Sequence, residues 1–143
     1  MYDEDIREIL LDYFDCCGRK IRVFEEKIMG KSRADLILVT EEGLVGIEIK
    51  SDADTYERLK RQVRDYDRFC DRNYIAVGKS HEKHVTEHIP GHWGIYCVSM
   101  KDGEPVIELK KEATEHKKCQ VKEQIRWMWR MELNQLLEWN HLP

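Results

Sequence analysis

The chain has 143 residues, 41% hydrophobic and 36% charged, a composition typical of one globular domain with a strongly ionic surface. No apolar run approaches the ~18 residues that a membrane-spanning helix needs, so we expect no membrane association. The formal net charge of -4 excludes a protein that holds nucleic acid by bulk positive charge, and any polyanion must therefore meet a local patch.

The N-terminal residues and the cysteines indicate a cellular location. Three of the first five residues are acidic, and none is basic as in a signal or transit peptide. Five cysteines, an odd number without a C-x-x-C pair, predict reduced thiols and not a disulfide framework. We therefore expect a cytoplasmic protein with a single domain over residues 1–143. Its core is expected at about 1–110 and a C-terminal helix at about 113–140.

Hydrophobic spacing predicts helices and strands in a mixed order along the chain. A helix is expected over residues 2–14, with Asp3 as its cap. Three strands over 21–29, 34–39 and 44–50 should form a meander. The segments that follow are a helix at 56–72, a strand at 74–77, a short helix at 80–89, a strand at 94–98, an edge strand at 106–109 and a long helix at 113–139. This order predicts an α/β (α+β) fold with a mixed central sheet between helices.

Two acidic residues are expected to meet across the second and third strands. Alternation along 44–50 puts Glu48 and Lys50 on one face. If residues 41–42 form a two-residue hairpin loop, the register sets Asp35 opposite Glu48, with Cβ atoms roughly 5 Å apart. A three-residue loop with a bulge at Gly43 would shift that register by one. Paired carboxylates repel unless a cation lies between them, so the first register predicts a Mg²⁺ or Mn²⁺ site.

The tripeptide Glu-x-Lys is not specific by itself. It occurs four times, beginning at Glu25, Glu48, Glu108 and Glu115. Only the Glu48 copy has an acid at the start of the neighbouring strand. The alternative interpretation is a polar strand face in solvent.

A longer pattern surrounds this copy. An acid in one strand is followed thirteen residues later by Glu-x-Lys in the next strand, and then by polar residues on a helix. The residues concerned are Asp35, Glu48, Ile49, Lys50, Ser51, Arg58, Leu59, Gln62 and Tyr66. The pattern resembles the PD-(D/E)XK nuclease superfamily, in particular small nuclease-like proteins of bacteria and phages, some of them linked to DNA repair. The likeness covers about residues 26–98, with Ala34 in place of the superfamily's proline.

The resemblance implies a restriction-endonuclease-like fold and metal-dependent hydrolysis of DNA phosphodiester bonds. Asp35, Glu48 and the carbonyl of Ile49 would hold one or two Mg²⁺ or Mn²⁺ ions. Lys50 would orient the attacking water and offset charge on the phosphate oxygens. A third carboxylate is common in the superfamily, and Glu26 is preferred to Glu8, which the helical wheel turns toward solvent.

The helix at 56–72 is expected to contribute further site residues. Gln62 and Tyr66 lie at the border between its apolar stripe and an arginine stripe. Ordinary core packing would explain Tyr66 equally well. The arginines would follow a phosphate backbone or, alternatively, pair with Glu57 and Asp65. The nucleic-acid contacts implied are Arg33, Ser51, Arg58 and Arg61.

Two other features have both a functional and a structural interpretation. His81, His84 and His88 share a face of the short helix and could bind zinc, but no suitably placed acid or cysteine completes a ligand set. The main apolar stripe of the C-terminal helix comprises Val121, Ile125, Met128, Trp129, Leu133, Leu136 and Leu137. It leaves Trp127 and Met131 exposed, which predicts a homodimer or protein-partner face, unless the helix packs more deeply on the sheet.

Two functions therefore remain open. The first is a Mg²⁺-dependent deoxyribonuclease centred on Asp35, Glu48 and Lys50. The second is a nuclease-fold module, catalytically weak or inactive, that binds nucleic acid or a protein partner.

Overall fold

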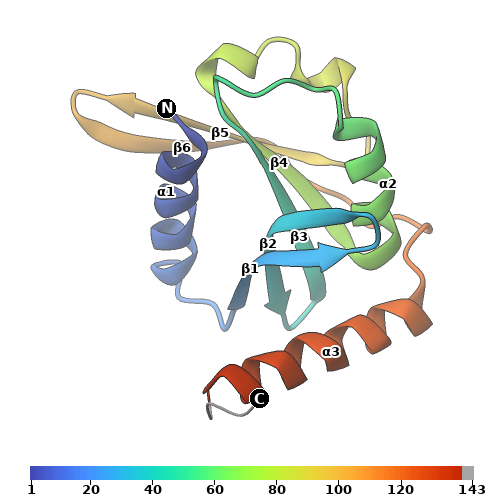
Figure 1. Ribbon diagram of the computed structural model, residues 1–143. Coiled ribbons are helices and arrows are strands. Elements are labelled where there is room, and N and C mark those ends of the chain that lie inside the picture. Colours follow the sequence, from blue (N-terminus) through green and yellow to red (C-terminus); the bar gives the residue numbers. More distant parts are fainter. Residues whose placement is uncertain (140–143) are drawn as a thin grey trace.

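The computed structural model describes residues 1–139 of the chain, with the side chains of residues 1–132. Six strands form one sheet in sequential order (Figure 1). The strands are β1 (Arg22–Met29), β2 (Ser32–Thr40), β3 (Gly43–Lys50), β4 (Arg72–Gly78), β5 (Gly94–Lys101) and β6 (Glu104–Lys111). The helices are α1 (Asp3–Asp15), α2 (Leu59–Phe69) and α3 (Val121–Trp139), with short 3-10 helices η1 (Lys79–His81) and η2 (Val85–Glu87).

The sheet is mixed. β1, β2 and β3 form the predicted antiparallel meander, β3, β4 and β5 run parallel, and β6 returns antiparallel as an edge strand. The expected α/β class, with a mixed central sheet flanked by helices, is confirmed. Among the helices of residues 1–139, none is long and apolar enough to span a bilayer.

The helices divide into two layers, one on each face of the sheet. α1 packs Ile6, Leu10 and Phe14 against the face that carries Ile47 and Ile49 of β3. α2 and α3 share the opposite core, which contains Tyr66, Phe69 and Trp127. In Figure 1, α1 (blue) accordingly lies across the sheet from α2 (green), and α3 (red) crosses below. Glu48 and Lys50 alternate with Ile47 and Ile49, so they point into the α2 layer.

Several predicted boundaries are wrong. α2 is shorter than the 56–72 prediction because Arg72 already begins β4. The helix predicted at 80–89 is two single 3-10 turns, and residues 112–120 are irregular. Asp3 is the first helical residue of α1 and not its cap, which is Tyr2.

The packed face of α3 is also different from the prediction. Trp127 and Met131 are 7% and 3% exposed and lie in the α2-side core, whereas Trp129 is 73% exposed. The Trp127 ring contacts Phe69, and its Nε1–H donates to the carbonyl of Ile28 at 2.8 Å. The predicted exposure of Trp127 and Met131 is therefore wrong, since both residues pack inside the chain. The side chains of Leu133, Leu136 and Leu137 lie outside the described part.

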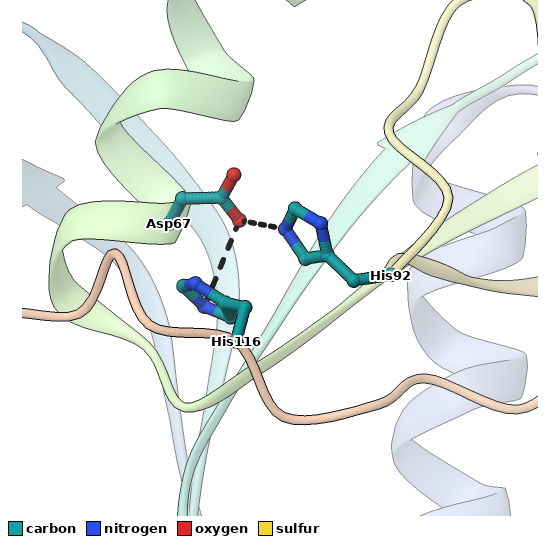
Figure 2. A group of neighbouring side chains, drawn as sticks. All are labelled: Asp67, His92 and His116. Atoms are coloured by element: carbon teal, nitrogen blue, oxygen red, sulfur yellow. Dashed lines mark hydrogen bonds and ion pairs between the residues drawn. The ribbon is translucent and has the colours of Figure 1, made fainter.

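A buried polar cluster ties α2 to two distant segments (Figure 2). Asp67 of α2 contacts His92 from the loop before β5 and His116 from the segment between β6 and α3. The His116 Nε2 atom also lies 2.9 Å from the carbonyl oxygen of Cys70. The cluster joins three parts of the chain on the α2 side of the sheet.

Candidate active site

The hairpin between β2 and β3 has the two-residue loop on which the metal-site prediction depends. Thr40 pairs with Gly43, and the ladder continues to Leu36 opposite Ile47. Gly43 adopts a φ of 126°, a conformation that glycine reaches at little cost, so no bulge shifts the register. The next step of this ladder sets Asp35 beside Glu48, as expected.

The Asp35 carboxylate is held at the start of β2 by the neighbouring strand. Its Oδ2 atom accepts a hydrogen bond from the backbone N–H of Ile49 at 2.8 Å. The Asp35 side chain is 18% exposed, so the carboxylate remains accessible from the cleft beside it. Ile49 is thus brought to the site through its N–H, and the role of its carbonyl in metal binding stays a prediction.

Glu48 is buried in the sheet directly beside this carboxylate. Its side chain is 1% exposed, and its Oε2 atom is buried without a hydrogen-bond partner among the described residues. Burial, and then the hydrogen bond and charge of Asp35, raise the pKa of Glu48 well above its ordinary value, while the Lys50 charge opposes the shift. An unpartnered carboxylate oxygen in this position is costly unless a proton or a cation satisfies it.

Tyr66 of α2 contacts both residues of the acidic pair through its hydroxyl group. Its hydroxyl accepts a hydrogen bond from the Asp35 N–H at 3.1 Å and lies within donating distance of the Ile47 carbonyl and the Glu48 Oε1, at 3.0 and 3.2 Å. Burial raises the pKa of Tyr66 well above its usual value, so the phenol stays protonated. A Cβ on Gly46 would lie 2.4 Å from the Tyr66 ring, which explains the glycine in β3. Tyr66 is both a core residue and a positioning residue for the site.

Lys50 ends β3 on the same face as Glu48. It is 6% exposed, yet no hydrogen bond or ion pair within 4.0 Å reaches its ammonium group among the residues that the structure describes. A buried lysine without a fixed partner carries a desolvation cost and is free to contact an incoming anion. Its position beside Glu48 is compatible with the predicted contact with a water molecule or a phosphate oxygen.

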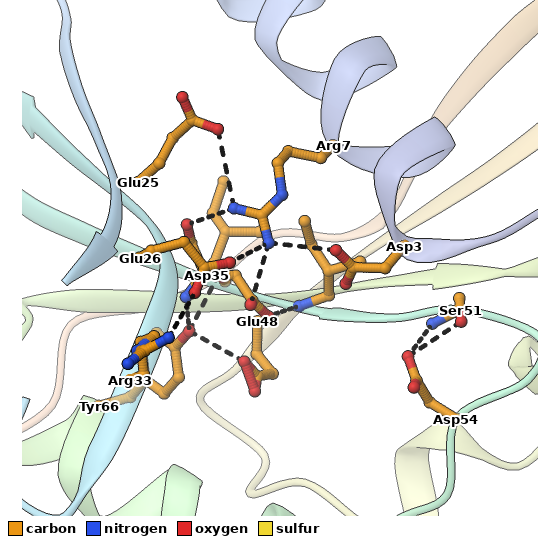
Figure 3. Close-up of polar contacts among 12 residues, drawn as sticks. Asp3, Arg7, Glu25, Glu26, Arg33, Asp35, Glu48, Ser51, Asp54 and Tyr66 are labelled. Atoms are coloured by element: carbon orange, nitrogen blue, oxygen red, sulfur yellow. Dashed lines mark hydrogen bonds and ion pairs between the residues drawn. The ribbon is translucent and has the colours of Figure 1, made fainter. Parts of the chain in front are cut away.

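Arg7 of α1 is a cation at this site that the sequence analysis missed (Figure 3). Its Nη2 atom lies 2.6 Å from Glu26, 3.1 Å from Asp3 and 3.4 Å from Asp35. Its Nη1 donates to the Asp35 carbonyl at 3.1 Å and lies 3.7 Å from Glu25. The Arg33 guanidinium also lies 3.9 Å from Glu26, so five acidic residues, counting Glu48, share two guanidinium groups and Lys50.

The structure distinguishes the candidates for a third acidic ligand by their distance from the Asp35/Glu48 pair. Glu8 is exposed on α1, as the helical wheel predicted. Glu26 of β1 reaches the cluster through Arg7, and its φ of 53° is unusual for a residue other than glycine. Asp3 lies at the same guanidinium, and burial raises its pKa. The i, i+4 spacing of Asp3 and Arg7 is the available sequence signal, and this spacing is equally typical of an ordinary ion pair on a helix.

A cleft of about 490 Å³ opens beside Asp35. Gln62 lines it, and the Gln62 Oε1 atom is buried without a partner in the described part of the chain. Ser51 does not reach this surface, because it is 2% exposed and its hydroxyl donates to Asp54 at 3.0 Å. The Ser51 contact with nucleic acid is therefore not supported. The cationic residues that line the cleft are Lys31, Arg33, Arg58 and Arg61.

Ion pairing divides the predicted arginine stripe in two. Arg68 pairs with Glu123, and Arg72 pairs with Glu42 and Glu115, so both are committed to structural contacts. The expected partner Asp65 instead accepts a hydrogen bond from Ser32. Arg58 and Arg61 form no ion pair with a residue in the described range. Of the arginines on or next to α2 that form no ion pair with described residues, Arg58 and Arg61 line the cleft, whereas Arg64 does not.

Comparisons with known proteins identify a family. The family profile described as Bacteriophage P4 protein cII matches residues 4–141. No curated protein matches the sequence. A solved structure of Pyrococcus furiosus SfsA in complex with Ca²⁺ is similar at 15% identity and a TM-score of 0.41, over 80% of this chain and 62% of the SfsA chain. Because the profile spans nearly the whole sequence, the chain belongs to the Bacteriophage P4 protein cII family.

Proposed function

We propose that this chain is a Mg²⁺- or Mn²⁺-dependent nuclease that hydrolyses DNA phosphodiester bonds, with a role in DNA repair or processing. The observation that carries the proposal is the pairing of Asp35 with Glu48, whose Oε2 atom is buried and unpartnered. Hard oxygen donors of this kind suit a divalent cation. The donor set therefore fits the metal that the resemblance implies.

Each residue of the site then has a chemical role. Asp35 and Glu48 would hold the ion, with Asp3 and Glu26 nearby as further acids. A bound divalent ion supplies polarisation of the phosphate and a more acidic water molecule. Lys50 would donate to that water or to a phosphate oxygen as charge develops there. The Tyr66 hydroxyl would position the pair, because it binds the backbone N–H of Asp35 and the Glu48 carboxylate.

Gln62 and the cationic cleft would bind the substrate. Arg58 and Arg61 are exposed and unpaired with described residues, so they can contact phosphate groups without first breaking an ion pair. The Gln62 Oε1 atom lacks a partner and accepts hydrogen bonds, which suits a donor on water or on a base. This cleft ends at Asp35, next to the proposed site of cleavage.

One observation favours a second candidate, a weak or inactive nuclease-fold module that binds nucleic acid or a protein. Arg7 places a positive charge among the acids that would hold the ion. A divalent ion must therefore displace or share its carboxylates with this guanidinium. If the carboxylates stay paired with Arg7 and no divalent ion binds, the cleft would bind DNA without cutting it.

A nuclease assay separates the two candidates. Purified wild-type protein and Asp35→Asn are incubated with single-stranded, duplex and branched DNA and with RNA, in Mg²⁺, Mn²⁺ or EDTA. We expect cleavage of at least one DNA substrate that needs the metal and is lost in Asp35→Asn. DNA binding without cleavage in either metal would contradict the nuclease and support the binding module.

The cleft arginines give a further prediction about binding. The double variant Arg58→Ala/Arg61→Ala should weaken DNA affinity and lower the slope of log affinity against log salt by about 1 to 2, because each phosphate contact contributes about one unit. Arg64→Ala, which removes an exposed arginine on α2 that does not line the cleft, serves as the control. Fluorescence anisotropy over a salt series measures both. Equal slopes in the two variants would exclude the cleft as the binding surface.

A further inference from the structure

Asp67 of α2 places a carboxylate in the core outside the Asp35/Glu48 site. Asp67 is 2% exposed, and its Oδ1 atom accepts hydrogen bonds from Trp93 Nε1 at 2.9 Å and Asn73 Nδ2 at 3.0 Å. Both donors are neutral. They hold the carboxylate in one orientation but compensate its negative charge only in part.

Among the described residues, two histidines also approach this charge. His92 Nε2 lies 2.9 Å and His116 Nε2 lies 3.8 Å from Asp67 Oδ1. No lysine or arginine within the described residues forms an ion pair with Asp67. Neutral hydrogen-bond donors compensate the charge of a buried carboxylate only in part, and a metal ion held between Asp67 and the two imidazoles would compensate it further.

The ligand geometry favours a transition metal. The three ligand atoms lie within 4.8 Å of one another. Zinc bonds of about 2.0–2.1 Å in tetrahedral geometry separate neighbouring ligand atoms by roughly 3.4 Å, and the two measured distances lie on either side of this value. Two imidazoles and one carboxylate suit zinc and disfavour magnesium, which prefers oxygen ligands. In Figure 2 one contact runs from each imidazole ring to the Asp67 carboxylate.

The surroundings supply the remaining requirements of a metal site. The His92 side chain is 18% exposed, which gives a metal ion a path from solvent to the cluster. The two imidazole rings lie close together, with centroids 4.6 Å apart. Trp93 and Asn73 act on the carboxylate as outer hydrogen-bond donors. His116 Nε2 lies 2.9 Å from the Cys70 carbonyl, and its Nδ1 accepts a hydrogen bond from the Lys118 N–H at 3.2 Å; both contacts would be given up if Nε2 bound a metal ion.

We propose that Asp67, His92 and His116 bind one zinc ion through three protein ligands, with a fourth position left to water. This site is separate from the Asp35/Glu48 site and takes a different metal. Its ligands come from α2, the loop before β5 and the segment after β6, so the ion joins these three segments. The main consequence of binding is therefore stabilisation of the fold around α2.

Zinc titration tests the proposal directly. The protein is prepared with Cys16→Ser and Cys17→Ser, because these two exposed thiols could bind zinc on their own. Competition with a chromophoric chelator in reducing buffer is expected to give one zinc per chain. The affinity should fall at least tenfold in His92→Ala and in His116→Ala and stay unchanged in His84→Ala, which alters an exposed histidine outside the cluster.

Two further measurements test zinc binding without a substitution in the cluster and without an assay of nuclease activity. Co²⁺ added to the unsubstituted cluster should give the visible absorption of a tetrahedral ion, and zinc but not Mg²⁺ should raise the melting temperature. Asp35→Asn should retain zinc binding, so failure of the nuclease proposal and failure of this one are distinguishable. No stoichiometric zinc and no tetrahedral Co²⁺ spectrum, or equal zinc affinity in a folded His92→Ala, would overturn the proposal.

Discussion

Replacing Lys50 with methionine is expected to lower the rate of metal-dependent DNA cleavage by about 100- to 1,000-fold, while DNA affinity changes little. The magnitude is that of removing one donor aimed at charge that develops in a transition state. Lys50 is 6% exposed and unpaired with described residues, so its charge is held in a poorly solvated place next to Glu48. Such a charge acts mainly on the reacting groups and contributes little to binding.

Methionine keeps the apolar stem of the lysine, and removing a buried, unpaired charge should not destabilise the fold. Single-turnover cleavage and anisotropy, measured on the same protein samples, separate chemistry from binding. Lys122→Ala, an exposed lysine on α3, is the matched control. A Lys50→Met protein that cleaves at the wild-type rate would show that the ammonium plays no part in the reaction.

The second large effect concerns stability. In EDTA near neutral pH, Glu48→Gln is expected to be more stable than the wild type by about 1 to 2 kcal/mol, because it removes a buried charge that faces Asp35. Glutamine retains an oxygen that can accept the Tyr66 hydroxyl. With Mg²⁺ present the order should reverse, since the ion stabilises only the protein with both carboxylates.

The pH dependence follows from the direction of the pKa shift. Folding raises the pKa of Glu48 above its ordinary value of 4.5, so the protonated carboxyl contributes stability that is complete below that value. The contribution is lost as pH rises through the raised pKa. Urea unfolding in EDTA should therefore show the wild type losing stability relative to Glu48→Gln as pH increases.

Glu8→Gln changes an exposed carboxyl on α1 and controls for the loss of one charge. It should leave the free energy of unfolding within about 0.5 kcal/mol of the wild type at every pH. A Glu48→Gln protein that is less stable than the wild type in EDTA, or equally stabilised by Mg²⁺, would show that Glu48 is not a strained metal ligand.

The sheet and the central pair were predictable because they depend on local pattern. Strict alternation in β3 and the two-residue loop fix the register, and the register alone sets Asp35 beside Glu48. The packed face of α3 was not predictable in the same way. Apolar residues lie on two faces of that helix, and only the contacts of Trp127 with Phe69 and Ile28 decide which one is buried.

The features that could not be predicted from the sequence depend on contacts between segments that are distant in the chain. Arg7 joins the site because α1 brings it beside Glu26 of β1, and no spacing in the sequence predicts that contact between distant segments. Asp67, His92 and His116 come from three segments whose ends are far apart in the chain. The His81, His84 and His88 set fails as a ligand group because residues 79–87 form 3-10 turns, and two of its rings pack on Tyr56 instead.

The central claim is that Asp35 and Glu48 together hold a divalent cation against the competition of Arg7. Calorimetric titration of the wild type, Asp35→Asn and His92→Ala with Mn²⁺ tests it most directly. The account predicts that wild type and His92→Ala bind Mn²⁺ with the same stoichiometry and affinity, and that Asp35→Asn loses this binding. Absence of Mn²⁺ binding to the wild type, or undiminished binding to Asp35→Asn, would contradict it.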